Sequence, residues 1–178
     1  MKRLSPSLAR LLMVVAALIG FFASGYLFYE YVTGGRIACA IVSGCDVVRS
    51  SSWATSFGIP RPFFGLVFYG AVFYLLILRT ILTKWARELY LATIAFAVIG
   101  FIESALLFVV QWLDLKAFCF WCLLSGLAAT VVFFAMLVDR PIPAEEGVRA
   151  RELKRIFWVL ALYAPIAVAS FIWLTQLS

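Results

Sequence analysis

Residues 116–126 read KAFCFWCLLSG and place two cysteines, Cys119 and Cys122, at the start of a long apolar run. The run continues without a charge from Ala117 to Val138. At about 1.5 Å per residue this is long enough for a helix to cross a bilayer. The sequence therefore predicts a membrane helix that carries a thiol pair in its first turns.

The composition of the whole chain is that of a membrane protein. Hydrophobic residues make up 65% of the 178 residues and charged residues 13%, and the mean hydropathy is +1.05. Soluble domains are typically about 45–50% apolar and about 25% charged. The sequence contains no histidine, which excludes His-ligated haem, imidazole zinc sites and Cys-His catalysis. The net charge of +6 comes from basic residues that flank apolar runs, so we expect no nucleic-acid partner.

Five segments are long and apolar enough, or nearly so, to span a membrane. They are Leu11–Tyr29, Pro62–Leu78, Leu89–Leu113, Ala117–Val138 and Ile156–Ser178. We expect the first to be an uncleaved helix, because its apolar stretch exceeds the roughly 7–15 residues of a signal-peptide core. The predicted fold is an all-α integral membrane protein. It has a four-helix core with an outer cap loop, then a cytoplasmic linker and a fifth transmembrane helix, at 1–140 (cap loop 32–61), 141–155 and 156–178.

The basic residues predict how these spans are oriented. With the N-terminus inside, all but four of the 15 Lys and Arg residues lie on the cytoplasmic side. The four outer ones are Arg36, Arg49, Arg61 and Lys116. We therefore expect a multi-pass protein with the N-terminus inside and the loop at 32–61 outside, which in a prokaryote is the oxidising side of the cytoplasmic (inner) membrane. That side of the membrane permits disulfides, as does the lumen of the eukaryotic endoplasmic reticulum.

All four cysteines fall on the outer side in this orientation, as two close pairs. Cys39 and Cys45 enclose a loop in which the dipeptide Ser-Gly favours a turn, so the pair can close a disulfide. Cys119 and Cys122 lie one turn apart at a helix start, where unpaired N–H groups and the helix dipole lower a thiol pKa. This arrangement predicts a relay in which the loop pair meets a soluble dithiol partner and the helix pair meets a lipid-soluble oxidant.

Two other interpretations of the four cysteines stay open. One is a non-enzymatic membrane scaffold that two structural disulfides hold together. The other is a zinc site with four thiolate ligands, although the spacing C-x₅-C exceeds the roughly two to four intervening residues that zinc sites prefer. The predicted disulfide relay requires no metal, so we expect no metal site in the protein.

Three stretches together resemble the vitamin K epoxide reductase family in its bacterial and archaeal form. They are SGCDVVRSSSWATSFGIP at 43–60, FFGLVFY at 63–69 and FCFWC at 118–122. The resemblance implies a four-helix bundle around a quinone, capped by the loop and a short half-helix. It also implies that Cys122 lies nearest the quinone, that Cys119 exchanges disulfides with Cys45, and that Cys39 takes the attack from the partner.

The activity that this resemblance implies is oxidation of a thiol partner and reduction of a menaquinone- or ubiquinone-type quinone, in support of disulfide formation. We expect a separate thioredoxin-like or DsbA-like partner, because no thioredoxin-like sequence follows the fifth predicted span. Animal members carry an Asn where this chain has Arg61 and a Tyr where it has Gly126. In the family those two residues are tied to vitamin K and its epoxide. A thiol-driven vitamin K quinone or epoxide reductase is therefore the alternative function and not the first one. The DsbB family also has two cysteine pairs, but in the opposite order along the chain.

Further residues are predicted to contact the quinone or to order its surroundings. They are Ser51, Phe57, Arg61, Phe63, Phe64 and Trp121. Arg61 is expected either to donate a hydrogen bond to a quinone carbonyl or to be a solvated loop charge. Glu103, within the third predicted span, is expected either to relay protons or to be a neutral carboxylic acid, hydrogen-bonded inside the bundle.

Overall fold

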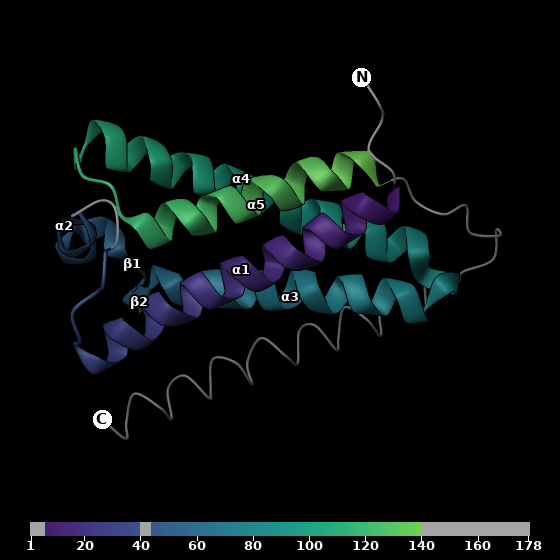
Figure 1. The fold of residues 1–178 in the computed structure, drawn as a ribbon, viewed down its shortest axis with the longest axis horizontal. Coiled ribbons are helices and arrows are strands. Elements are labelled where there is room, and N and C mark those ends of the chain that lie inside the picture. The colour runs from purple at the N-terminus through teal and green to yellow at the C-terminus, as the bar shows by residue number, and fades with distance from the viewer. Residues whose placement is uncertain (1–5, 40–43, 140–178) are drawn as a thin grey trace.

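Four long helices build the part of the protein that the structure describes, and Figure 1 shows their arrangement. The structure, a computed structural model, describes residues 6–39 and 44–139. The helices are α1 (Pro6–Thr33), α3 (Arg61–Ile81), α4 (Ala86–Leu113) and α5 (Phe120–Val138). All four are long and apolar enough to cross a membrane, which confirms the predicted all-α membrane fold. The predicted linker at 141–155 and fifth span at 156–178 lie outside the described residues.

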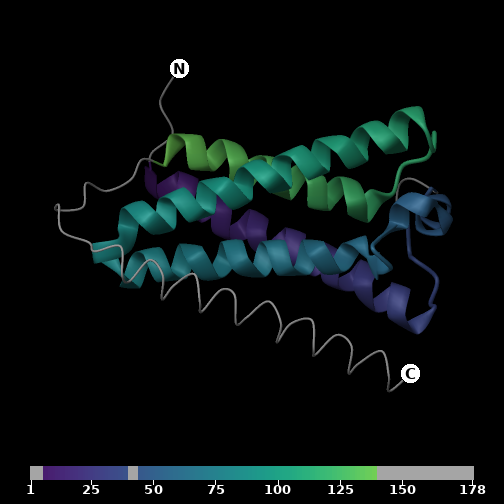
Figure 2. The ribbon, with the colours of Figure 1, turned by 180° about the vertical axis from the view of Figure 1, so that it is seen from behind.

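Helices α1 and α4 each pack between α3 and α5, so the four helices form a closed bundle (Figure 2). Small side chains line the core between α1 and α5. They include Ala9, Ala16 and Ala17 of α1 and Ala128, Ala129 and Ala135 of α5. Small residues let helix backbones approach closely, which is a typical way for membrane helices to associate where lipid is as apolar as the protein.

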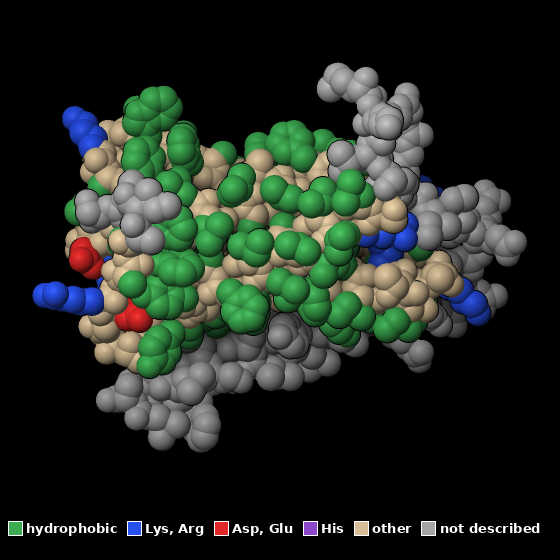
Figure 3. Space-filling model, in the orientation of Figure 1, with side chains coloured by type: hydrophobic (Ala, Val, Ile, Leu, Met, Phe, Trp, Pro, Cys, Tyr) green, Lys and Arg blue, Asp and Glu red, His purple; other side chains and the backbone are tan. Residues whose placement is uncertain are grey.

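The two ends of the bundle differ from its middle in their chemistry. Figure 3 shows a broad band of hydrophobic side chains across one face, with charged side chains gathered at both ends. We call one end the thiol end, because it holds the cysteines at 39, 45, 119 and 122. We call the other the arginine end, after Arg10 and Arg79, which pair there with Asp139.

At the arginine end, one buried carboxylate joins the helices. Asp139 is fully buried at the end of α5. Its Oδ1 accepts a hydrogen bond from Arg10 Nε at 3.1 Å, and its Oδ2 accepts one from Arg79 Nη1. The Arg79 guanidinium also lies 5.2 Å from the ring centroid of Tyr90 on α4. Groups from all four helices therefore meet around this one charge cluster.

At the thiol end, the connection between α1 and α3 folds into a cap. It contains α2 (Cys45–Ser50), a 3-10 helix η1 (Ser52–Ala54), and an antiparallel hairpin of β1 (Thr55–Ser56) and β2 (Ile59–Pro60). A second 3-10 helix, η2 (Thr83–Trp85), joins α3 to α4 at the opposite end. The cap thus occupies the predicted outer loop, and α2 corresponds to the half-helix that the family resemblance implies.

Candidate active site

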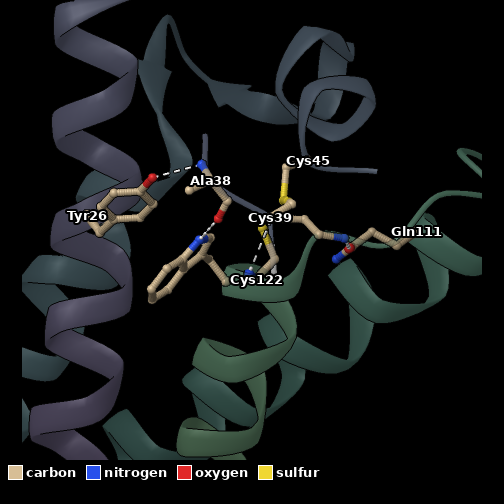
Figure 4. Close-up of a disulfide and its surroundings, with 8 residues drawn as sticks. Tyr26, Ala38, Cys39, Cys45, Gln111 and Cys122 are labelled. Carbon is tan, nitrogen blue, oxygen red and sulfur yellow. Dashed lines mark hydrogen bonds between the residues drawn. A yellow bond between two sulfur atoms is a disulfide. The ribbon is translucent and has the colours of Figure 1, made fainter. Parts of the chain in front are cut away.

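The structure brings the two cysteine pairs together at the thiol end. Cys39 and Cys45 form a disulfide with their Cα atoms 6.4 Å apart, whereas Cys119 and Cys122 are free thiols (Figure 4). All four belong to one packed apolar cluster with Leu27. Cys45 and Cys119 are almost fully buried, and Cys39 is half-buried. The sequence predicted this meeting of a loop pair and a helix pair.

A glycine allows the two pairs to meet. A Cβ atom on Gly44 would lie 2.7 Å from both the backbone nitrogen and the carbonyl oxygen of Phe118. Real Cβ atoms do not come so close to backbone, so a larger residue would force the two segments apart. Because Cys45 directly follows Gly44 and Cys119 directly follows Phe118, this backbone approach sets the two thiol pairs side by side.

Cys119 is the cap residue of α5. Its Sγ accepts a hydrogen bond from the backbone N–H of Cys122 at 3.4 Å. Hydrogen bonds from the Cys122 side chain and from the N–H groups of Cys122 and Trp121 lower the pKa of the Cys119 thiol, although burial opposes them. The lowered pKa agrees with the prediction for a thiol at a helix start, and it favours the thiolate that disulfide exchange needs.

A buried amide on α4 fixes the backbone of this cap residue. The Cys119 N–H donates to Oε1 of Gln111 at 2.8 Å, and the Gln111 amide nitrogen donates to the Leu107 carbonyl at 3.3 Å. Gln111 is therefore a positioning residue for the thiol pair. The sequence analysis missed it, although Glu103, Leu107 and Gln111 recur at a spacing of four, which places them on one helix face.

Trp121 holds the loop that carries Cys39. Its indole Nε1 donates to the Ala38 carbonyl at 2.8 Å, and the Ala38 N–H donates to the Tyr26 hydroxyl at 2.8 Å (Figure 4). The Tyr26 and Trp121 rings pack with centroids 4.5 Å apart. The sequence predicts a quinone contact for Trp121, whereas in the structure its indole is hydrogen-bonded to the loop.

Two cavities meet at Cys122. The larger has a volume of about 590 Å³, lies within the bundle and is lined by residues of all four long helices. The smaller, of about 50 Å³, lies under the cap, where Cys45 and Cys119 line it. Cys122, Arg61 and Gln111 line both cavities. Among the described residues, Cys122 is the cysteine that faces the larger one.

Of the six predicted quinone contacts, Arg61 and Phe64 line the large cavity. Phe63 is buried instead against the ring of Phe28, with centroids 5.8 Å apart. Helix α3 begins at Arg61, and Pro62 in its first turn fixes a backbone angle that suits a helix start. This start places Arg61 directly beneath the cap.

Two further predicted contacts belong to the cap. The Ser51 hydroxyl donates to the Val48 carbonyl at 2.7 Å and so closes the end of α2. The prediction for Phe57 is wrong in this structure, because its side chain is fully exposed at the tip of the hairpin. Phe57 (φ 55°) and Gly58 (φ 79°) form the two-residue turn, whose positive φ angles match the twist of the two strands. The turn carries the Phe57 ring away from the bundle.

Arg61 and Glu103 form an ion pair beside the large cavity, through Arg61 Nη1 and Glu103 Oε1. The Arg61 guanidinium lies 5.8 Å from the Trp53 ring centroid. Its buried Nε has no hydrogen-bond partner among the described residues. Arg61 is therefore paired and mostly buried rather than a solvated loop charge, and Glu103 contacts Arg61 at the edge of the bundle rather than a group inside it. Because α4 runs past the start of α3, Glu103 lies level with the first residue of α3.

A second polar group of the large cavity lies about two turns further along α3. The Tyr69 hydroxyl donates to the Ser125 carbonyl oxygen and lies 3.1 Å from the Ser125 hydroxyl. The Ser24 hydroxyl of α1 lies 3.4 Å from the same Ser125 oxygen. A Cβ on Gly20 would overlap the Tyr69 ring, so this glycine makes room for the tyrosine. The sequence analysis missed Ser125.

Comparisons with known proteins agree with this site. The family model described as "Vitamin K epoxide reductase family" matches residues 11–137. The chain is also 30% identical over 163 residues to the protein named thiol-disulfide oxidoreductase LTO1 of Arabidopsis thaliana. That alignment covers 83% of this chain and 39% of the relative, so the chain spans well under half of the relative's length. The family match covers most of each of the four helices and all four cysteines, and the chain belongs to the vitamin K epoxide reductase family.

Proposed function

We propose that this chain is a membrane thiol:quinone oxidoreductase that oxidises a separate thioredoxin-like dithiol protein and reduces a quinone. The position of Cys122 carries the proposal. Its side chain lines the small cavity together with Cys45 and Cys119, and it also lines the large cavity in the bundle. A thiol at this junction is in reach of disulfide exchange on one side and of a lipid-soluble acceptor on the other.

The large cavity fits a quinone ring in size and in chemistry. Its volume of about 590 Å³ lies within the range of roughly 300–1,000 Å³ that is usual for ligand pockets. Most of its lining is apolar, with Arg61 at one place and the Ser125 hydroxyl at another as hydrogen-bonding groups. A quinone, when bound, accepts two electrons and two protons and leaves as the quinol.

The relay begins at the loop pair. A thiolate of the reduced partner attacks Cys39 Sγ, breaks the Cys39–Cys45 bond and releases the Cys45 thiolate. The partner's second thiolate then attacks the mixed disulfide and leaves as an intramolecular disulfide. Two electrons of the partner now reside on the loop pair, and the half-buried Cys39 is the more accessible of the two sulfurs for this attack.

Exchange between the pairs follows. Cys45 attacks Cys119 in the oxidised helix pair and releases Cys122 as a thiolate beside the large cavity. Cys39 then attacks Cys45, which restores the loop disulfide and leaves both helix thiols reduced. The structure corresponds to this state, with Cys39 and Cys45 joined and the other two free. The helix pair gives its two electrons to the acceptor and becomes a disulfide again.

We place the thiol end on the oxidising side of a prokaryotic cytoplasmic membrane. The excess of Lys and Arg in segments predicted to be cytoplasmic supports this orientation. A menaquinone- or ubiquinone-type acceptor suits that membrane. Gly126 lines the large cavity where the animal members carry a tyrosine, so the proposal favours a quinone over an epoxide as acceptor.

Quinone reduction under anaerobic conditions tests the proposal. Purified protein in detergent receives a reduced thioredoxin-like donor and a quinone, and the loss of quinone absorbance is followed. We expect the wild type to consume quinone and the Cys122→Ala variant to lose this activity while its Cys39–Cys45 disulfide and its thermal unfolding stay unchanged. If folded wild-type protein consumes none of several quinones, the proposal is refuted. A parallel assay with a quinone epoxide tests the alternative acceptor.

A further inference from the structure

Glu103 and Arg61 have no role in the electron relay, yet both line the large cavity that Cys122 faces. We infer that Glu103 delivers a proton to the quinone oxygen that Arg61 holds. This inference rests on the proposed function and assigns the site its proton donor. The contact between the two side chains, and their shared place on the cavity wall, support this inference.

The reaction needs a proton donor inside the cavity. Among the described residues, the ionisable side chains that line it are Arg61, Glu103, Tyr69 and Cys122. An arginine stays protonated in proteins, and the Tyr69 hydroxyl already donates to the Ser125 carbonyl. Cys122 supplies electrons. Glu103 is the carboxyl group of this set, and a carboxyl group gains and loses a proton readily.

Glu103 lies on the outer side of its contact with Arg61. Its side chain is 53% exposed, whereas that of Arg61 is 19% exposed. The carboxylate thus lies at the rim of the bundle just below the cap, and the guanidinium reaches inward from it. A carboxylate within a membrane span is costly, and such groups commonly mark proton pathways.

Arg61 has further N–H groups that can donate hydrogen bonds to the quinone. One of its terminal nitrogens donates to Glu103, while its buried Nε has no partner among the described residues. A guanidinium donates up to five hydrogen bonds, so Arg61 can hold Glu103 and a quinone carbonyl oxygen at the same time. This geometry directs the proton of Glu103 toward the oxygen on which negative charge develops.

The helix dithiol loses two electrons and two protons and becomes the Cys119–Cys122 disulfide. One proton reaches the acceptor from this dithiol and the other from the Glu103 carboxyl group. The second thiol proton goes to water, and Glu103 regains a proton from water, so its charge is the same at the end of each turnover. Arg61 is the charged group that faces Glu103; Cys122 of α5 and Tyr69 of α3 are the other titratable groups on the cavity walls.

A single-turnover experiment tests the inference. Protein reduced at the helix pair is mixed with excess quinone across a pH series, for wild type, Glu103→Gln, Glu103→Asp and Glu88→Gln. Glu88→Gln makes the same chemical change near the opposite end of α4 and is the matched control. We expect Glu103→Gln to lower the single-turnover rate constant about 100-fold or more and to change its pH profile, Glu103→Asp to recover part of the rate, and the control to match the wild type.

A second readout separates proton delivery from positioning of Arg61. Quinone affinity is measured by quenching of tryptophan fluorescence in the Cys122→Ala background, in which no turnover occurs. We expect Glu103→Gln to leave this affinity within about twofold and Arg61→Gln to weaken it about tenfold, as for loss of a charged hydrogen bond. A Glu103→Gln variant with a weakened quinone affinity and an unchanged pH profile of the single-turnover rate constant would overturn the inference. A wild type that does not reduce quinone would instead refute the proposed function itself.

Discussion

The two ends of the bundle use charged side chains in opposite ways. At the arginine end, both oxygens of Asp139 accept hydrogen bonds, one from Arg10 and one from Arg79, and the carboxylate is fully buried. At the thiol end, Arg61 pairs with the half-exposed Glu103 and keeps a buried Nε without a partner among the described residues. Charged side chains that use their hydrogen bonds on one another join the helices. A charged side chain that keeps an unused N–H donor beside a cavity can bind a ligand there.

The same difference extends to the apolar surroundings. The core toward the arginine end contains fully buried side chains such as Met13, Val132 and Met136. Toward the thiol end the helices line the large cavity from Cys122 to Thr130 along α5, a length of roughly 12 Å. The bundle is therefore closed at one end and holds room for a ligand at the other. Substitutions at the two ends should accordingly affect stability and activity separately.

The largest loss of stability is expected at the arginine end. Asp139→Asn leaves two arginines without their shared carboxylate, and breaking a buried ion pair typically costs about 3–5 kcal/mol. We expect thermal unfolding in detergent at a clearly lower temperature, with the rate of quinone reduction by the remaining folded protein unchanged. Asp114→Asn is the control, because this exposed carboxylate accepts a hydrogen bond from Trp53 that an amide oxygen can also accept. Equal losses in the two variants would remove the contrast between the ends.

Gly44→Ala should cause an intermediate effect that acts on both stability and the relay. The added methyl group would collide with the backbone of Phe118, and forced overpacking typically costs about 1–3 kcal/mol. We expect slower disulfide exchange between the two pairs, measured by quenched alkylation and mass spectrometry. Gly70→Ala is the matched control, because its Cβ would meet Phe21 at an ordinary 3.7 Å. Exchange at the wild-type rate in Gly44→Ala would show that the close approach is not needed.

Trp53→Phe should loosen the cap with a smaller loss of stability. The variant loses the hydrogen bond from Trp53 Nε1 to Asp114 Oδ2 at 2.8 Å, which is worth about 0.5–1.5 kcal/mol. We expect faster hydrogen exchange of the α2 amides and no change in the amides at the arginine end. Trp112→Phe, at an exposed position on α4 at the same end, should leave the α2 amides as protected as in the wild type.

The smallest expected effect is a shift in the titration of Cys119. Because hydrogen bonds from Cys122 lower its pKa, the Cys119 thiolate persists to lower pH than an ordinary thiol. Removing the side-chain donor in Cys122→Ala should raise this pKa, whereas the hydroxyl in Cys122→Ser should keep it low. The ultraviolet absorbance of the thiolate, followed against pH with the Cys39–Cys45 disulfide intact, compares the two variants. Identical titration curves would contradict the assigned cause.

The sequence allowed the helices and the two thiol pairs to be predicted because their signals are local. Uncharged runs of sufficient length mark membrane helices, and a C-x-x-C at the head of such a run marks the helix pair. The lowered pKa of Cys119 could be predicted for the same reason, since it depends on the first turn of its own helix.

Contacts between distant segments could not be predicted in the same way. The pairing of Arg61 with Glu103 depends on how far α4 extends past the start of α3, which hydropathy does not indicate. The exposure of Phe57 follows from the two-residue turn of the hairpin, although its neighbour Gly58 is a turn signal in the sequence. The anchoring of Trp121 to Ala38 likewise depends on the folded cap.

Disulfide trapping tests the central claim, that the two pairs exchange through Cys45 and Cys119. The Cys39→Ala/Cys122→Ala variant retains those two thiols, and the Cys45→Ala/Cys122→Ala variant retains Cys39 and Cys119 as the matched control. After mild oxidation, mass spectrometry of the peptides gives the yield of each disulfide. We predict a high yield of Cys45–Cys119 and little or no Cys39–Cys119. Failure of Cys45–Cys119 to form in folded protein, or equal yields of both disulfides, would contradict the account.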